Sequence, residues 1–460
     1  METKHVDVLI IGSGSGSKIT RPAASLGYSV AIIEKGPFGG TCLNRGCIPS
    51  KMLIHPADIM AEIEEANKFN ITVSKPTIDK QKLVKRVSES IDKDSNSIGP
   101  MYAKIPNLSV YRGECKFIGT HTVQVNDVRV SADKIFIVAG CRANIPTIPG
   151  IEGTPYLTYA EALRLEEQPE SMLVLGGGYI AVELGYYFGM TGTKVDFAVR
   201  SQLLSAIDKD IRKVFQDEFC KRFPVHLQMK PISVSYHDKK FHTKIQLKTG
   251  EVREFVTTHL LSAIGVAPVT DQLNLAAHGY QLDCEGFIKV DSSFRTNIPN
   301  VWAFGDIIGH PMFRHTANYQ GEWVFNSVFK DTALQKVGIT YPPIPAAVFS
   351  NPQIGTVGLT QEEAEAKYSK VLIGTADYPD CAMGAALQVD HGMVKLIFAG
   401  DGYELVGAHI VGKEASTLIH ILIAYMRCKA NLEILKDTIY IHPALAEVVR
   451  NAVRDAVSNL

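Results

Sequence analysis

The sequence predicts an α/β protein with two Rossmann-like units and a further C-terminal module. An apolar, strand-like run from Val6 to Ile11 leads into the glycine-rich residues 12–17, and residues 172–175 lead in the same way into residues 176–181. The second copy begins 164 residues after the first (176 − 12), which indicates a repeated βαβ unit. Three prolines between residues 342 and 345 then mark a change of pattern.

The remaining elements follow from periodicity. Each glycine-rich stretch should be followed by a helix and a second strand, at residues 29–33 and 194–199. Short alternating segments between Leu108 and Val138 predict small antiparallel strands. The C-terminal module should contain an amphipathic helix from Glu414 to Cys428 and a last helix from Pro443 onward.

Composition excludes several classes of protein. A chain of 460 residues suggests about three domains at roughly 150 residues each. Its 47 Lys and Arg against 48 Asp and Glu give a net charge of −1, which argues against nucleic acid or an anionic membrane as the main partner. No apolar run approaches the roughly 18 residues of a membrane span. Without a signal-peptide pattern and with only eight cysteines, the chain is expected to be soluble and cytoplasmic.

The first glycine-rich loop has the context of a dinucleotide site. It follows a strand and precedes a helix, and Glu34 lies 22 residues after Gly12 (34 − 12). Gly12 and Gly14 let the backbone approach a pyrophosphate, and Glu34 can accept hydrogen bonds from a ribose. Ser17 stands at the third glycine position, and Pro22 predicts a short or irregular helix.

The second loop carries Gly176, Gly178 and Ala181 in the same pattern. Its distal strand ends in Val199 and Arg200, so no carboxylate is available for a free ribose 2′-hydroxyl. An arginine suits a 2′-phosphate, which favours NADPH over NADH. The alternative is a solvated surface arginine.

Two cysteines point to redox chemistry. Cys42 and Cys47 are separated by four residues (43–46), a spacing that allows a disulfide. Pro49 suits the first turn of a helix, whose N-terminus would stabilise a Cys47 thiolate. A zinc site would need two further ligands at matching spacing, which we do not assign, so we expect no metal. Chance proximity of two inert thiols is the other alternative.

These motifs resemble one known family. The stretch GGTCLNRGCIPSK at residues 39–51 resembles that of the class I pyridine nucleotide-disulfide oxidoreductases, which include dihydrolipoamide dehydrogenase, glutathione reductase and mycothione reductase. Residues 301–306 resemble the family's second flavin motif, and residues 344–360 the start of its dimerisation domain. Residues 441–447 match its His-Pro-x-x-x-Glu signature.

The resemblance implies four segments. Residues 1–150 and 273–340 would form an FAD-binding domain in two parts, with an NAD(P)-binding domain at 151–272 between them. Residues 341–460 would form an α+β dimerisation domain. A homodimer is implied, with each active site shared between the subunits.

The resemblance also implies an electron relay. FAD would be held by Gly12, Gly14, Glu34, Gly305 and Asp306, and the nicotinamide nucleotide by Gly176, Gly178, Tyr179, Ala181 and Arg200. Cys47 would lie nearer the flavin, and Cys42 would exchange with the substrate sulfur. His442 would be the acid–base, because imidazole titrates near neutral pH, and Glu447 would orient its ring.

Two further positions take roles from the resemblance. Lys51 would pair with Glu183 beside the flavin N5 and bind FAD there; alternatively it is a solvated helix lysine. Tyr179 would cover the flavin until the nicotinamide arrives; alternatively it packs a helix. Arg45, between the cysteines, departs from the usual valine and could lower a thiolate pKa, attract an anionic disulfide or face solvent.

Three functions follow. The residues of the motifs favour a dihydrolipoamide dehydrogenase-like enzyme, whose dithiol substrate could be a lipoyl group on a carrier protein. Arg200 favours an NADPH-dependent reductase of a low-molecular-weight disulfide, of the mycothione or glutathione type. A non-catalytic flavoprotein subunit would be expected to have lost the cysteines or His442. The C-terminal residues lack a cysteine pair, which argues against mercuric reductase and the large thioredoxin reductases.

Overall fold

The structure, a computed structural model, describes residues 3–309 and 311–460. The chain folds into two compact units. The first contains Met1–Ser50, Val84–Ile145 and Gly265–Thr340; the second contains Lys51–Leu83, Pro146–Ile264 and Tyr341–Leu460. The domain limits 1–150, 151–272, 273–340 and 341–460 remain a prediction.

A seven-stranded sheet is the centre of the first unit. Its order is β3-β2-β1-β6-β5-β4, with β16 beside β6. The strands are β1 (Thr3–Ile11), β2 (Val30–Glu34), β3 (Leu108–Arg112), β4 (Cys115–Gly119), β5 (Thr122–Val125), β6 (Val128–Ile137) and β16 (Val301–Ala303). Ile11 is in register with Ile33 in the parallel pair β1–β2, so the loop after β1 and the end of β2 lie at one edge.

The prediction of antiparallel strands from Leu108 to Val138 is confirmed for β4, β5 and β6 and was wrong for β3. β4 pairs antiparallel with β5, and β5 with β6, whereas β3 pairs in parallel with β2. β6 also pairs in parallel with β1 on its other side. Two long helices, at residues 47–64 and 80–103, lie between β2 and β3 in the chain, so β3 is reached by a crossover rather than a hairpin.

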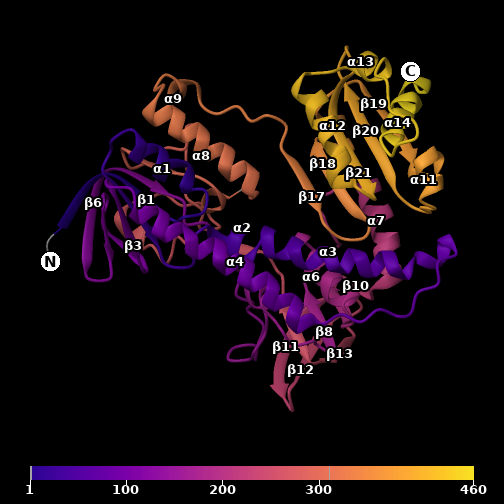
Figure 1. Cartoon of the computed structure of the whole chain (residues 1–460), viewed down its shortest axis with the longest axis horizontal. Coiled ribbons are helices and arrows are strands. Elements are labelled where there is room, and N and C mark those ends of the chain that lie inside the picture. The colour runs from indigo at the N-terminus through magenta and orange to yellow at the C-terminus, as the bar shows by residue number, and fades with distance from the viewer. Residues whose placement is uncertain (1–2, 310) are drawn as a thin grey trace. The chain divides into compact units, whose positions relative to one another are not determined.

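Helices flank this sheet. In Figure 1, α1 (Ser17–Ser25) lies beside α8 (Arg314–Phe329), and the two are in contact. The prediction of a short first helix is confirmed, since α1 has nine residues and contains Pro22. The other elements of the unit are α2 (Gly40–Arg45), α9 (Leu334–Val337), η2 (Ala276–His278), η3 (Asp306–Ile308), β7 (Cys141–Ala143) and β15 (Val266–Pro268). Two helices, α3 (Cys47–Glu64) and α4 (Lys80–Ala103), run from one unit into the other.

The second unit contains the second Rossmann-like sheet, with the parallel order β10-β9-β8-β14. Its strands are β8 (Ser171–Leu175), β9 (Lys194–Val199), β10 (Val225–Leu227) and β14 (His259–Ser262), and its helices are α5 (Tyr159–Ala162), α6 (Tyr179–Met190) and α7 (Lys209–Arg222). A separate antiparallel sheet consists of β11 (Lys230–His237), β12 (Lys240–Gln246) and β13 (Val252–Thr257).

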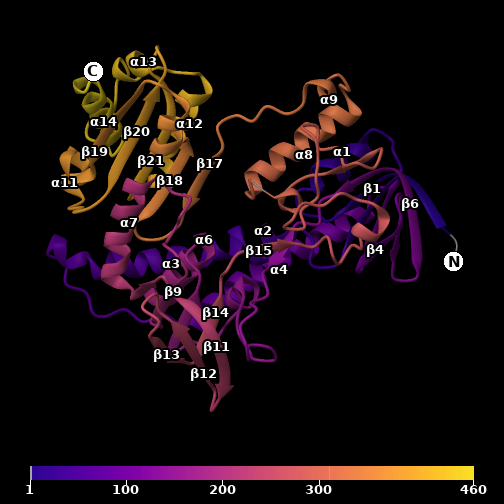
Figure 2. The same cartoon turned by 180° about the vertical axis from the view of Figure 1, so that it is seen from behind.

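An antiparallel sheet of order β17-β18-β21-β20-β19 completes the second unit, with α12 and α14 packed on it (Figure 2). The strands are β17 (Pro345–Val348), β18 (Gln353–Gly358), β19 (Val371–Asp377), β20 (Met393–Ala399) and β21 (Glu404–Gly412). The helices are α10 (Gln361–Lys367), α11 (Ala382–Ala386), α12 (Ala415–Arg427), α13 (Leu432–Lys436) and α14 (Glu447–Ser458), with η1 (Ala66–Phe69) and η4 (Tyr378–Asp380) elsewhere in the unit.

The two predicted C-terminal helices have different outcomes. The helix predicted at 414–428 is confirmed as α12. The last helix begins at Glu447 rather than at Pro443, because the Ala444 N–H is bonded to the Glu447 carboxylate in a turn before the helix.

A buried charge cluster joins α7 to the C-terminal sheet. The Lys395 ammonium, on β20, donates to Asp208 Oδ1 and Oδ2 at 3.0 and 3.1 Å and to Asp210 Oδ2 at 2.5 Å. The side chains of Lys395 and Asp208 are both 0% exposed, so each charge depends on the other for compensation.

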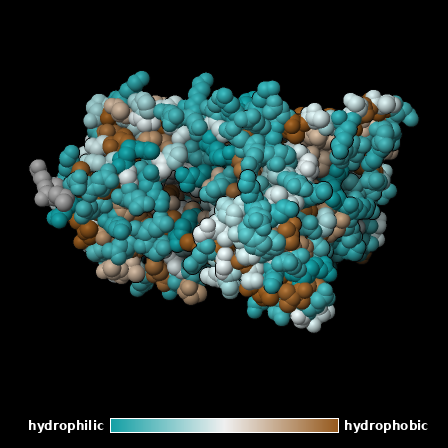
Figure 3. Space-filling view, turned by 90° about the horizontal axis from the view of Figure 1, so that it is seen from below, coloured by the Kyte–Doolittle hydropathy of each residue, from teal (hydrophilic) through white to brown (hydrophobic). Residues whose placement is uncertain are grey.

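The face of the molecule drawn in Figure 3 is largely polar. Figure 3 shows a face on which hydrophilic side chains predominate and hydrophobic ones form small separate groups. Among residues 3–309 and 311–460, no helix combines the length and apolarity that a bilayer crossing requires.

Candidate active site

The first glycine-rich loop is shaped for close approach by a ligand. Gly12 has φ +103°, and a Cβ there would collide with the Val138 carbonyl oxygen. A Cβ at Gly16 would collide with the Gly12 carbonyl oxygen. Ser17, at the third glycine position, begins α1 and donates its hydroxyl to Gly14 O at 2.9 Å. The loop therefore leads directly into a helix N-terminus, where an anionic group is stabilised.

Glu34 is fixed at the end of β2. Its Oε2 accepts from the Ser13 N–H at 2.9 Å and the Ser13 hydroxyl at 2.7 Å, and its Oε1 accepts from the Gly36 N–H at 2.8 Å. The carboxylate is thus held beside the loop, where it can accept hydrogen bonds from a ribose.

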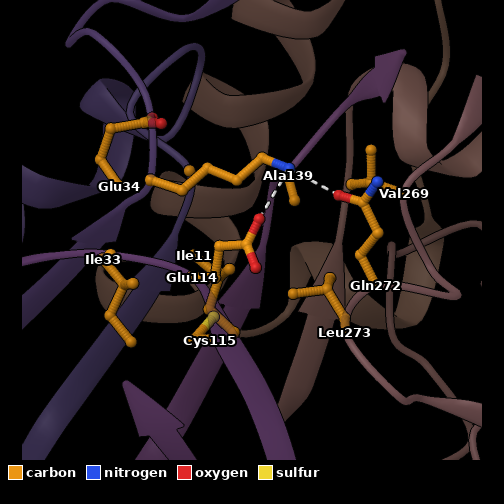
Figure 4. A pocket seen from close by; sticks show the side chains of 12 residues that line it. Ile11, Ile33, Glu34, Glu114, Cys115, Ala139, Val269, Gln272 and Leu273 are labelled. Carbon is orange, nitrogen blue, oxygen red and sulfur yellow. Dashed lines mark hydrogen bonds and ion pairs between the residues drawn. The ribbon is translucent and has the colours of Figure 1, made fainter. Parts of the chain in front are cut away.

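A pocket with a cavity volume of about 90 Å³ adjoins Glu34. Figure 4 shows Ile33 and Glu34 on one side of it and Val269, Gln272 and Leu273 on the other. The pocket is also lined by Ile11, Gly12, Lys35, Gly113, Glu114, Cys115 and Ala139. An apolar hollow beside the Glu34 carboxylate and the first glycine-rich loop is consistent with the predicted site for the adenosine half of FAD.

The residues predicted to form the second flavin motif lie in the same unit, at the start of η3. Gly305 has φ +76°, and its N–H donates to Gln320 Oε1 at 2.7 Å. Asp306 follows, and burial raises the pKa of its carboxyl while the Arg314 guanidinium acts in the opposite direction.

Arg314 is a site residue that the sequence analysis missed. A Cβ on Gly14 would lie 3.4 Å from Arg314 Nη1, which places the guanidinium on the first loop. Its charge acts on both Asp306 and Cys42. No motif marks it: Arg314 is the first residue of α8, 300 residues from Gly14 in the chain (314 − 14).

The two cysteines lie at the junction of two helices. Cys42 is in α2, and Cys47 is the first residue of α3, so the predicted position of Cys47 at a helix N-terminus is confirmed. Neither is in a disulfide, and Cys47 is exposed whereas Cys42 is half-buried. The pKa of Cys42 is raised by its hydrogen bond with Cys47 and by burial, whereas Arg314 acts to lower it.

The Arg45 guanidinium lies near Gly36, which follows the end of β2. The side chain is exposed, and a Cβ at Gly36 would be 3.5 Å from both Arg45 Nη2 and Glu34 Oε1. The guanidinium is therefore near the Glu34 carboxylate, which is predicted to bind the ribose.

Lys51 and Glu183 are paired within the second unit. Lys51 Nζ lies 2.6 Å from Glu183 Oε2 and 4.5 Å from the centroid of the Phe349 ring. The Phe349 N–H donates to Glu183 Oε1 at 3.1 Å. Burial raises the pKa of the Glu183 carboxyl, and the Lys51 ammonium counteracts that effect. Their role beside a flavin remains a prediction.

The second glycine-rich loop begins α6. Gly176 has φ +130°, and a Cβ there would collide with the Ala263 carbonyl oxygen. Gly178 is the N-cap of α6, half-buried Tyr179 its first residue, and Ala181 is fully buried. A Cβ on Gly177 would lie 2.6 Å from a Val199 methyl carbon, so the strand end beside this loop is apolar. Arg200 follows and is exposed.

The second unit also places His442 beside Glu447. His442 Nδ1 lies 3.0 and 3.2 Å from the two carboxylate oxygens, and Arg450 Nη1 lies 2.7 Å from Oε1. The His442 side chain is 69% exposed, whereas that of Glu447 is 2% exposed. A buried carboxylate thus orients an accessible imidazole.

The structure therefore groups the predicted residues in two sets. The first unit holds the FAD-site residues and both cysteines; the second holds the nicotinamide loop, Lys51 with Glu183, and His442 with Glu447. In the part of the chain that the structure describes, no group of three or more His, Cys, Asp or Glu side chains could hold a metal ion.

Known proteins share this organisation along the whole chain. The family "Pyridine nucleotide-disulphide oxidoreductase" matches residues 6–321, and its dimerisation domain matches residues 344–453. The chain is 31% identical to dihydrolipoyl dehydrogenase of Halobacterium salinarum, over 98% of this chain and 96% of that protein. It is 32% identical to mycothione reductase of Mycobacterium tuberculosis, over 98% and 99%.

A solved structure is also similar. The HOCl-induced flavoprotein disulfide reductase RclA from Escherichia coli superimposes with a TM-score of 0.86 at 26% identity, covering 97% of this chain and 99% of that one. The predicted fold, with two Rossmann-like domains and a C-terminal dimerisation domain, is confirmed. The chain belongs to the pyridine nucleotide-disulphide oxidoreductase family, whose members are flavoprotein enzymes that use FAD and NAD(P)H.

Proposed function

We propose that the chain is a dihydrolipoamide dehydrogenase-like enzyme. It would oxidise a small dithiol, such as a lipoyl group on a carrier protein, to the disulfide and reduce NAD⁺ to NADH with release of one proton. The observation that carries this proposal is the pair Cys42 and Cys47, with Cys47 at the N-terminus of α3 in the unit that holds the FAD-site residues.

The chain's residues divide the work. FAD would be bound by the backbone of Gly12 and Gly14 and by Glu34, Gly305 and Asp306. When bound, FAD carries two electrons between the thiols and the nicotinamide. The residues lining the pocket and loop fit that cofactor. Gly176, Gly178, Tyr179, Ala181 and Arg200 would bind the nicotinamide nucleotide.

The thiols and the histidine carry the exchange. The N-terminus of α3 stabilises a Cys47 thiolate, and Cys42 would attack or release the substrate sulfur. With Nδ1 donating to Glu447, Nε2 of His442 is the atom that would take and return the proton. Lys51, held by Glu183, would place a cation beside the flavin.

A specific observation favours a second function, NADPH-dependent reduction of a low-molecular-weight disulfide. The end of β9 is the apolar Val199 followed by exposed Arg200, where a ribose-binding carboxylate would otherwise stand. In that direction, NADPH and one proton reduce a disulfide to two thiols. The similarity to mycothione reductase is consistent with it.

One purified preparation separates these functions. The protein should be yellow, and initial rates with NADH, NADPH, NAD⁺ and NADP⁺ should be measured against lipoamide, dihydrolipoamide, glutathione disulfide and mycothione. NADPH preference without lipoamide turnover would overturn the dehydrogenase. A colourless protein would overturn both functions.

The redox pair has its own test. Cys47→Ser should abolish turnover with every disulfide and leave reduction of the flavin by the nicotinamide nucleotide intact. Cys220→Ser is a matched control, because Cys220 is an exposed thiol in the second unit. Unchanged disulfide turnover in Cys47→Ser would remove Cys47 from the relay.

The shared active site of the homodimer can be tested by complementation. Homodimers of Cys42→Ser and of His442→Ala should both be inactive. When the two are mixed and allowed to exchange subunits, a shared site gives each heterodimer one intact Cys42–His442 pair. Activity should therefore return, whereas a site within one subunit gives none.

A further inference from the structure

A lysine spans the pocket that adjoins Glu34. Lys35 directly follows Glu34, and its Nζ donates to Gln272 Oε1 at 2.5 Å and lies 4.0 Å from Glu114 Oε1. Figure 4 shows Glu114 and Gln272 with dashed lines that meet at one nitrogen atom between them. All three residues line the pocket.

The three residues come from separate parts of the first unit. Lys35 follows β2, Glu114 lies between β3 and β4, and Gln272 follows β15. Lys35 and Gln272 are 237 positions apart in the chain. The contact therefore connects parts of the pocket lining that come from different elements.

This contact contributes little to folding. The Lys35 side chain is 48% exposed and that of Glu114 is 77% exposed, and solvent screens ion pairs of that kind. It can accordingly open and close without disturbing the sheet beneath. A bridge between two walls of a pocket can slow the exit of a ligand that the pocket holds.

We propose that Lys35 is a latch on the adenosine pocket, bridging Glu114 and Gln272 so that bound FAD is retained. The proposal rests on the assignment of this pocket to FAD. Glu34 and Lys35 then have separate roles, since the carboxylate would bind the ribose, while the Lys35 ammonium bridges two other parts of the pocket lining. Residues at the two ends of the bridge are binding residues and take no part in electron transfer.

The test is the rate at which FAD leaves the holoenzyme. Dissociation is followed by the rise in flavin fluorescence after dilution into buffer with excess ADP, which blocks rebinding. Lys35→Met keeps the stem and removes the ammonium, and we expect release about fivefold faster, which corresponds to about 1 kcal/mol for one hydrogen bond. Lys35→Arg should restore slow release.

Two controls distinguish a latch from a general loosening. Lys116→Met changes an exposed lysine on β4 that does not line the pocket and should leave release unchanged. Gln272→Leu should accelerate release in the wild type and have no further effect in Lys35→Met. The denaturation midpoint of the apoprotein should be the same for all these variants.

The outcomes separate the latch from the cofactor assignment. Wild-type release rates in Lys35→Met, or equal acceleration in Lys116→Met, would overturn the latch alone. Additive effects of Lys35→Met and Gln272→Leu would show that the bridge does not act as one unit and would overturn it too. A wild-type protein that binds no FAD would overturn the assignment of the pocket together with the latch.

Discussion

His442 and Glu447 form an imidazole–carboxylate pair in which one member is accessible and the other buried. Nδ1 of His442 lies 3.0 Å from Oε1 of Glu447, and their side chains are 69% and 2% exposed. Glu447 also accepts from the Ala444 N–H at 3.2 Å and pairs with Arg450. The carboxylate is thus fixed from the protein side, and it fixes the ring that faces outward.

Glu447→Gln should therefore reduce disulfide turnover while leaving flavin reduction by the nicotinamide nucleotide unchanged. The amide cannot stabilise an imidazolium, so we expect a loss in kcat of about tenfold to a hundredfold. The measurement is the pH profile of kcat, whose acid limb should change shape. The control is Glu433→Gln, which removes an exposed carboxylate on α13, not far before Glu447 in the chain. Equal profiles for both variants would contradict the role of the pair.

The same carboxylate should leave a signature in acid stability. The hydrogen bond from His442 holds the pKa of Glu447 below its ordinary value of 4.5. A lowered carboxyl pKa contributes stability that is complete above 4.5 and is lost as the pH falls through the lowered value. The urea midpoint of the wild type should thus fall more steeply below pH 4.5 than that of Glu447→Gln. Parallel curves would refute the linkage.

Lys51→Met should destabilise the protein at neutral pH by leaving the Glu183 carboxylate unpaired. We expect about 2 kcal/mol, below the roughly 3–5 kcal/mol for a fully buried pair, because Lys51 is 35% exposed. Burial raises the pKa of Glu183, so the deficit should appear as the pH rises above 4.5 and shrink on acidification. Unfolding by urea at pH 5 and 8 measures it. Glu183→Gln in the same chain should restore stability; failure to do so would mean the loss has another cause.

Arg200→Glu should change the choice of nucleotide. If Arg200 binds the 2′-phosphate, kcat/KM for NADPH should fall by about tenfold to a hundredfold, the loss of one charge-assisted hydrogen bond, while NADH use changes little. Arg253→Glu, on the exposed strand β13, gives a control with the same charge change. Equal losses of kcat/KM with both nucleotides would mean that Arg200 is a solvated surface residue that does not bind the 2′-phosphate.

Arg314→Gln should alter the reactivity of Cys42. The guanidinium lowers the pKa of that thiol against the effects of the Cys47 hydrogen bond and burial. In a Cys47→Ser background, the pH at which iodoacetamide reacts at half its maximal rate should therefore rise when Arg314 is removed. Arg295→Gln, an exposed arginine of the same unit, should leave that pH unchanged. A profile that does not move would exclude Arg314 from the thiol environment.

The parts that could be predicted from sequence are local ones. The two glycine-rich loops, the strands before them and the position of Cys47 at the start of α3 depend on residues close together in the chain. Glu34 could be assigned because its distance from Gly12 is set by one βαβ unit. The pairing of Lys51 with Glu183 came from family resemblance, not from any local pattern.

The rest depends on contacts between distant segments. Arg314 reaches Gly14 only after α8 packs on α1, and Lys35 finds Gln272 across 237 positions. A single arginine or glutamine in a helix or loop has no periodicity that would distinguish it from a surface residue. The parallel pairing of β3 was missed for a related reason, since alternation shows that a strand is half-buried but does not identify its neighbour.

The Lys395–Asp208 contact has a consequence for the exchange of parts between relatives. Suppose that a nucleotide-binding module with no acid at position 208 replaced the one in this chain. Lys395, whose side chain is 0% exposed in the C-terminal sheet, would then lose its buried partner. The two positions must therefore change together, either both charged or both apolar. A chimera in which only the nucleotide-binding module is exchanged should therefore fail to fold until position 395 is changed to match the new residue at position 208.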